Sequence, residues 1–150
     1  MNVIKIFLLS ACVSLTFASC TSTEKVEDMA TIATPVANEF FRLVQNEKFD
    51  STKFLFTDFF LSEVNGDSFV SYLEQKAHWL GRIQKYTLEQ NNFVVSHKEG
   101  VEKHEFIQTY KVEYENRRLS KYDFIFLEED IKGGHPKIGE FHTDVYTPSE

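Results

Sequence analysis

The sequence predicts an α+β fold in which three N-terminal helices pack on a curved four-stranded antiparallel sheet. Apolar residues between about positions 34 and 80 recur every three or four residues, which is the period of helices. After Gly81 the period becomes two, which is the period of strands, and it persists almost to the end of the chain. Short turn sequences divide this second half, so neighbouring strands are expected to pair as antiparallel hairpins.

The first helix is expected to begin at Thr34. Thr34 and Pro35 have the pattern of an N-cap followed by proline at the first helical position. One face then carries apolar residues at helical spacing, up to a helix end near Glu47: Val36, Phe40, Leu43 and Val44. Residues 20–33 are polar and lack a clear period, so we predict a tether there, with a reach of roughly 20 Å as a random coil.

Two further helices are expected before the sheet. Asp50 is placed to cap the second, which should be buried on more than one side because it carries two pairs of apolar residues spaced four apart: Leu55 with Phe59 and Phe56 with Phe60. Asn65-Gly66 marks a turn, and Asp67 is placed to cap the third helix. Gly81 ends that helix after a stripe of five residues: Phe69, Tyr72, Leu73, Lys76 and Leu80.

Four strands follow, at about Ile83–His97, Glu102–Glu115, Leu119–Glu129 and Lys137–Tyr146. The turns between them fall at Glu99-Gly100, Asn116-Arg117 and Gly133–Pro136. Each turn is short enough for an antiparallel hairpin.

The register of the hairpins follows from the turns. A two-residue turn at Glu99-Gly100 pairs Phe93 with Phe106, but the apolar pattern further on matches only if one extra residue is inserted. We therefore predict a β-bulge at Asn91-Asn92, which should curl the sheet. In the next hairpin, a three-residue turn at 116–118 would pair Val112 with Tyr122 and Tyr110 with Phe124, which gives one continuous aromatic face.

The first 19 residues predict an exported protein. Lys5 supplies a positive start, and residues 6–18 form an apolar stretch that is too short for a resident membrane helix. Residues 17–20, Phe-Ala-Ser-Cys, resemble the lipobox of bacterial lipoproteins, with phenylalanine where leucine is usual. We therefore predict that residues 1–19 are removed and that Cys20 is lipidated. The alternative is a cut by the ordinary signal peptidase after Ala18, which would leave Cys20 as a lone thiol.

The mature chain is predicted to be a single domain over residues 34–147, with a short tail at 148–150. A domain of this size buries a little under 70% of its unfolded surface, which is enough for a core without crosslinks. The chain has 15 phenylalanines, so this core should be aromatic. Removal of residues 1–19 leaves 15 Lys+Arg against 23 Asp+Glu, a net charge of −8, which disfavours nucleic-acid binding and favours basic partners.

Three segments carry a resemblance to a known family: the Trp79–Ile83 hinge, the Tyr86–Leu88 strand start and the closing strand at residues 136–141. Between Val36 and Tyr146 the chain resembles small bacterial lipoproteins of unknown function, which are similar to nuclear transport factor 2-like, or cystatin-like, cone-fold domains. The resemblance implies a location at the periplasmic face of the outer membrane, because Thr21 and not aspartate follows the cysteine. It also leaves open a homodimer through the open sheet face.

Neither a cofactor nor a metal is predicted. The five histidines lack the spacing of a metal site, and the chain has no glycine-rich phosphate loop, no G-x-S-x-G and no H-E-x-x-H. His97 and His104 are expected to approach each other near Glu102 across the first hairpin, as surface residues. The acidic run Glu128–Asp130 is interpreted as a solvated rim and not as a calcium site.

The aromatic face of the sheet predicts a pocket beneath the helices. Gln108 should point inward, where a buried amide needs partners, and would either orient a ligand or bond to a helix terminus. The candidate pocket consists of six residues: Trp79, Tyr86, His104, Gln108, Tyr110 and Phe124. Candidate acids or bases for catalysis are Asp58, His78 and His104, although Asp58 and His78 fit equally well on solvated helix faces.

The leading hypothesis for function is a noncatalytic envelope lipoprotein, held at a membrane by lipid on Cys20, whose domain binds a small apolar ligand or a protein partner. The first alternative is an immunity or inhibitor protein whose acidic surface covers a basic protein. Salt should separate these, because association driven by charge weakens with ionic strength. The second alternative is a small hydrolase or isomerase, which needs a closed pocket with an inward acid or base.

Overall fold

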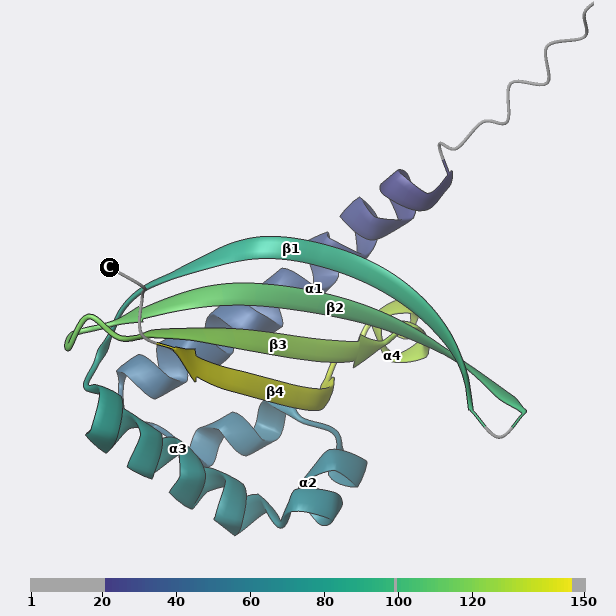
Figure 1. Cartoon of the computed structure of the whole chain (residues 1–150). Helices are drawn as coiled ribbons and strands as arrows, with labels where there is room; N and C mark the ends of the chain where they lie inside the picture. The colour runs from purple at the N-terminus through teal and green to yellow at the C-terminus, as the bar shows by residue number, and fades with distance from the viewer. Residues whose placement is uncertain (1–20, 99, 147–150) are drawn as a thin grey trace, which may run out of the picture.

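The computed structural model describes residues 21–98 and 100–146 and confirms the predicted α+β fold. Its helices are α1 (Thr21–Gln45), the 3-10 helix η1 (Asp50–Leu55), α2 (Asp58–Val64), α3 (Gly66–Leu80) and α4 (Glu128–Lys132). Its strands are β1 (Ile83–Lys98), β2 (Val101–Tyr114), β3 (Leu119–Leu127) and β4 (Ile138–Tyr146). The strands form one antiparallel sheet in the order β1-β2-β3-β4 (Figure 1).

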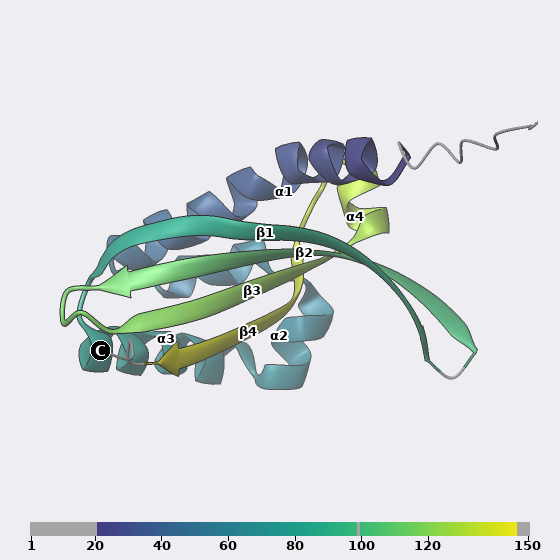
Figure 2. The ribbon, with the colours of Figure 1, turned by 45° about the horizontal axis from the view of Figure 1, so that its top comes forward.

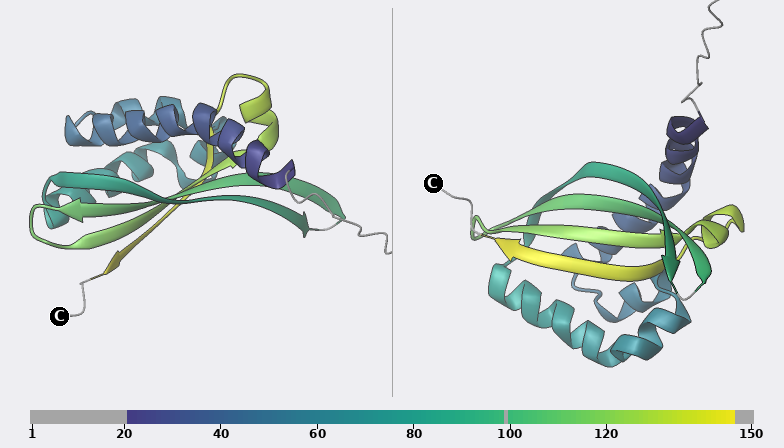
Figure 3. Two further views of the ribbon diagram at one scale, coloured as in Figure 1. Left: turned by 90° about the horizontal axis from the view of Figure 1, so that it is seen from above. Right: turned by 45° about the vertical axis from the view of Figure 1, so that its right-hand side comes forward.

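The helices and the sheet form two layers. The sheet is strongly curved and is not closed into a barrel, and α1, α2 and α3 lie on its concave side (Figure 3). The far end of the β1–β2 hairpin extends beyond the helices (Figure 2). The concave face is therefore the surface that the helices can bury.

The predicted tether over residues 20–33 is wrong where the structure describes it, because α1 already begins at Thr21 and runs through Pro35. Met29 and Ala33 are buried and continue the apolar face of Phe40 toward the N-terminus. The Nζ atom of Lys25 lies 2.8 Å from a carboxylate oxygen of Glu128 in α4. Packing against the rest of the domain, and not local propensity, therefore stabilises this half of the helix.

The predicted second helix is also wrong, because the segment divides into η1 and α2. Phe56 adopts extended backbone geometry between them and forms a parallel bridge with Ile138 of β4. Thr57 then caps α2 by accepting a hydrogen bond from the backbone N–H of Phe60. The division leaves the side chain of Phe59 largely exposed, contrary to the prediction that this segment is buried on several sides.

The third helix is confirmed as α3, with Asn65 rather than Asp67 as its N-cap. The Asn65 side chain accepts hydrogen bonds from the backbone N–H groups of Asp67 and Ser68. Gly81 ends the helix with φ +78°, and a Cβ atom there would lie 3.2 Å from the Cβ of Glu115. Both the turn and the close approach of Glu115, the residue after β2, therefore favour glycine at this position.

The first hairpin has the predicted register, with Phe93 opposite Phe106 and Leu88 opposite Tyr110. The bulge lies between Leu88 and Gln90, not at Asn91-Asn92 as predicted. One extra residue anywhere between the pairs Phe93–Phe106 and Leu88–Tyr110 restores the apolar pattern, so this pattern alone does not locate the bulge. A second irregularity lies between Ile83 and Lys85 and adds to the curvature of β1.

The predicted β2–β3 register is wrong by two residues. The three-residue turn lies one position earlier, at residues 115–117, because Arg117 adopts the left-handed conformation and the N–H of Tyr114 bonds to the carbonyl of Arg118. Tyr110 is therefore opposite Tyr122, and Gln108 is opposite Phe124. A shift of two keeps each side chain on its predicted face, so the aromatic face is preserved.

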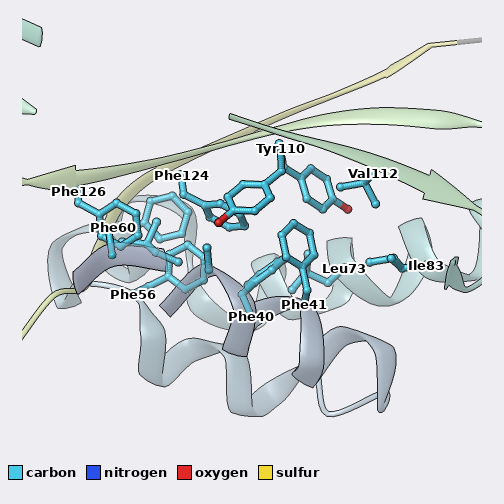
Figure 4. Close-up of a cluster of buried hydrophobic side chains, with 14 of the residues drawn as sticks. Phe40, Phe41, Phe56, Phe60, Leu73, Ile83, Tyr110, Val112, Phe124 and Phe126 are labelled. Atoms are coloured by element: carbon cyan, nitrogen blue, oxygen red, sulfur yellow. The ribbon is translucent and has the colours of Figure 1, made fainter. Parts of the chain in front are cut away.

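The core is an aromatic cluster between α1 and the concave face of the sheet. Phe40 and Phe41 project from α1 and contact rings from all around the domain (Figure 4). The ring of Phe40 makes edge contacts or tilted contacts with five others: Phe41, Phe56, Tyr122, Phe124 and Phe141. These contacts fill the space under the centre of the sheet.

Candidate functional site

The structure does not bring the six predicted pocket residues into one pocket. Tyr110 and Phe124 are buried against Phe40 and Phe41, which occupy the space where a ligand was expected. The partly buried Tyr86 stacks on Phe41, with ring centres 4.2 Å apart. Trp79 is 58% exposed on α3, with the guanidinium of Arg118 over its ring. The lipidation candidate Cys20 lies outside the described residues.

Gln108 points inward as predicted and joins α1 to the sheet. Its Nε2 atom donates to the Thr34 hydroxyl at 2.9 Å and to the Asn91 side-chain oxygen at 3.0 Å. Gln108 therefore joins the sheet to a helix, but through a side chain in the interior of α1 and not through a helix terminus as predicted.

The predicted acid and base candidates do not form a closed catalytic pocket. Asp58 is exposed at the start of α2, and His78 is exposed on α3. His104 is half-buried at the far end of the sheet, near the N-terminal half of α1. The three side chains therefore belong to different places on the surface.

His104 belongs to a network of charges, and its predicted approach to His97 near Glu102 is confirmed. Both histidines contact the Glu102 carboxylate, and the Nδ1 atom of His104 lies 2.8 Å from Glu128. Glu128 is buried at the start of α4, so the predicted solvated rim is wrong for this residue. The ammonium groups of Lys132 and Lys25 lower the pKa of Glu128 to about 2. These contacts hold α4 and the N-terminal half of α1 to the sheet.

A cavity of about 310 Å³ lies at the opposite end of the domain, between the end of α1, α3 and the sheet. Its apolar wall includes Val44, Phe49, Leu73, Ala77 and Ile83. Its charged and polar lining includes Gln45, Glu47, Glu74, His78, Arg82 and Glu115. The volume is at the lower end of the range for small-molecule sites.

Lys76 lines this cavity from α3 and is 6% exposed. Its ammonium group donates hydrogen bonds to the hydroxyls of Ser120, at 3.1 Å, and Thr143. It also lies 4.4 Å from the ring centre of Tyr122. Among the side chains that the structure describes, no carboxylate lies within 4.0 Å of this nitrogen. Lys76 is therefore a buried cation with uncharged partners.

Two tyrosines complete the lining. The hydroxyls of Tyr114 and Tyr122 share a hydrogen bond of 2.5 Å, and both residues line the cavity. Burial raises the pKa of Tyr114 to about 12 and raises the pKa of Tyr122 well above 10. Both phenols are therefore neutral hydrogen-bonding groups at physiological pH.

Burial also lowers the pKa of Lys76, from 10.5 to about 7, while the nearby charge of Asp144 opposes this shift. The cavity therefore has an amine that changes its charge near neutral pH. A buried group with a strongly shifted pKa beside a cavity is typical of functional sites.

Lys76 lies in the helical stripe expected from the sequence but is not among the predicted site residues. The signal that could have identified Lys76 as a site residue is its position on the apolar stripe of an amphipathic helix, since lysine is rarely buried without a partner. Its partners Ser120 and Thr143 lie on β3 and β4, far away in the sequence. Only the packing of α3 on these strands brings them to the ammonium group.

Comparison with protein-family models gives no match, and comparison with curated proteins gives no relative. In the part of the chain that the structure describes, no helix is long and apolar enough to cross a membrane. The same residues contain no group of three or more His, Cys, Asp or Glu side chains arranged to hold a metal ion.

Proposed function

We propose that this chain is an envelope lipoprotein, anchored through Cys20, whose domain binds a small and largely apolar ligand in the cavity between α1, α3 and the sheet. The observation that carries the proposal is the cavity itself, with about 310 Å³ of space between an apolar wall and a few polar groups. The core beneath the centre of the sheet is filled by phenylalanine rings, which supports the choice of the cavity as the proposed ligand site.

The position of α1 gives the anchored molecule an orientation. Cys20 directly precedes Thr21, the first residue of α1, so a lipid there is attached next to a helix that is packed on the domain. The 25 residues of α1 span roughly 37 Å at 1.5 Å per residue. The cavity lies at the other end of this helix, so the proposal places it away from the bilayer, where a ligand arrives from the aqueous compartment.

The anchor is tested by the intact mass of the native protein. We expect a chain that lacks residues 1–19 and carries acyl groups on Cys20, and we expect Cys20→Ser to lose both the lipid and the membrane association. Cys12→Ser is the matched control, because Cys12 lies in the segment that is removed. An uncut and unacylated N-terminus in the native protein would contradict the proposal.

The cavity is tested by thermal shift and calorimetry on the mature chain, with phenylacetate, phenylacetamide, octanoate and octanamide as probes. We expect at least one probe to bind, and we expect Ala77→Phe to abolish binding, because this change places a ring in the cavity. Ser71→Phe adds the same ring to the exposed face of α3 and should leave binding unchanged. Failure of all four probes, or equal binding by the Ala77→Phe variant, would refute this site.

A second candidate function is binding of a protein partner. Phe54 in η1 and Phe59 in α2 are 79% and 73% exposed, which is unusual for phenylalanine on the surface of a monomer. Crosslinking of the anchored protein in its native membrane, compared between the wild type and a Phe54→Ser, Phe59→Ser variant, tests this function. An identical crosslinking pattern would rule these two residues out as a docking surface.

A further inference from the structure

We infer that the cavity selects ligands that carry a carboxylate, and that the ammonium group of Lys76 binds this carboxylate. The inference rests on the proposed ligand-binding function and names the chemical class of its ligand. Lys76 and Tyr122 both line the cavity, and the Lys76 nitrogen lies 4.4 Å from the Tyr122 ring centre.

The charge of Lys76 favours an anionic ligand. An ammonium group that is removed from water needs a partner of opposite charge, because hydroxyls and an aromatic ring recover only part of its hydration energy. Ser120, Thr143 and the Tyr122 ring are all uncharged, and in the described chain no acidic group completes an ion pair with this nitrogen. A carboxylate in the cavity would supply the missing charge.

The hydrogen-bond donors near Lys76 also favour a carboxylate. The hydroxyl of Ser120 is already committed as a donor to the backbone carbonyl of Asp144, at 2.6 Å. In the bond between the Tyr114 and Tyr122 hydroxyls one hydroxyl donates and the other accepts, so the accepting hydroxyl keeps its own proton to donate elsewhere. A carboxylate accepts such a bond more strongly than a neutral group does. The ammonium and this phenol therefore favour the same class of ligand.

The other charges around Lys76 do not supply its counterion. Asp144, on β4, is exposed and acts on Lys76 from a distance beyond an ion pair. The rest of the cavity lining includes acidic and basic side chains: Glu47, Glu74, Glu115, Arg82 and His78. Tyr72, whose ring centre is 5.8 Å from the Lys76 nitrogen, has a pKa raised by burial and is neutral. Selection for an anion is therefore expected at Lys76 and not at the charged residues that line the rest of the cavity.

The test measures the affinities of matched acids and amides by calorimetry on the mature chain. Phenylacetate and octanoate are expected to bind about tenfold to a hundredfold more tightly than phenylacetamide and octanamide at pH 7, the range for hydrogen bonds to charged groups. Lys76→Met should remove this preference. Lys121→Met changes the net charge equally at an exposed position on β3 and should keep it.

Proton uptake provides a second measurement, which needs no variant. Binding of a carboxylate favours the ammonium form of Lys76, so at pH 8 the wild type should take up a proton when phenylacetate binds. The uptake appears as a dependence of the binding enthalpy on the ionisation enthalpy of the buffer, and phenylacetamide should show none.

The outcomes separate the inference from the proposed function. Equal affinities for acid and amide, or a preference that survives in Lys76→Met, would overturn the inference while the cavity remains a ligand site. Carboxylate binding at pH 8 without proton uptake would also overturn it. If none of the four probes binds, both the ligand site and its selectivity are refuted.

Discussion

Replacement of Phe40 by alanine is expected to lower the free energy of unfolding by about 3–5 kcal/mol. The Phe40 side chain is fully buried and its ring contacts five other aromatic rings. These rings come from α1, the segment after η1, β3 and β4, so none of them can move into the space without losing its own contacts. Urea unfolding followed by circular dichroism measures the change.

Phe54→Ala is the matched control for this prediction. Phe54 is 79% exposed, so the same truncation should change the free energy of unfolding by less than about 0.5 kcal/mol. A loss below about 1 kcal/mol in Phe40→Ala would mean that the aromatic cluster is not the packed core described above. A loss of about 3–5 kcal/mol in Phe54→Ala as well would contradict the exposure of Phe54, and the loss in Phe40→Ala could then not be assigned to the burial of its ring.

The stability of the protein is expected to rise as the pH increases from about 7 to about 10, by roughly 2–4 kcal/mol, because of Lys76. Its pKa is about 7 in the folded chain and 10.5 as the ordinary value for lysine. Between these two values the unfolded chain binds more protons than the folded chain, so a higher pH favours folding. Below pH 7 the ammonium form is buried in the folded chain and its full cost remains.

Above about pH 10 the trend is expected to reverse. Burial raises the pKa of Tyr110 and Tyr114 to about 12, so these phenols ionise first in the unfolded chain. The unfolded chain then binds fewer protons than the folded chain, and stability falls as the pH rises. The maximum of stability is therefore expected between the range governed by Lys76 and the range governed by the tyrosines.

Lys76→Met isolates the contribution of the lysine. This variant should lose the rise between pH 7 and pH 10 and should be more stable than the wild type at pH 6, because methionine fills a similar volume without a charge. Lys121→Met, at an exposed position, should keep the profile of the wild type. A wild-type profile that is flat between pH 7 and pH 10 would contradict the burial of the Lys76 ammonium group.

The hairpin of β1 and β2 shows how local signals predict structure well. Glycine at position 100 adopts the left-handed conformation in the turn, and the apolar pattern on each side admits one pairing, so Phe93 lies opposite Phe106 as predicted. In the following hairpin, the turn residue in the left-handed conformation is Arg117, which carries no comparable signal. The register there was predicted two residues away from the real one.

The segments that were predicted wrongly depend on contacts between distant residues. Residues 21–33 contain Met29 and Ala33 at helical spacing, but these two residues form a helix face only because the sheet and α4 bury them. The division between η1 and α2 depends on the bridge from Phe56 to Ile138, which joins residues far apart in the sequence. Local periodicity contains no information about such contacts.

Periodicity and turn residues act over a few neighbouring positions, so they predicted the α+β class, the faces of the strands and an aromatic core. They did not predict that phenylalanine fills the expected pocket or that a cavity forms at the C-terminal end of α1. They also did not predict that Lys76 lies against Ser120 and Thr143. The free space and the partners of a buried charge depend on how whole elements pack, and this packing joins residues that are distant in the chain.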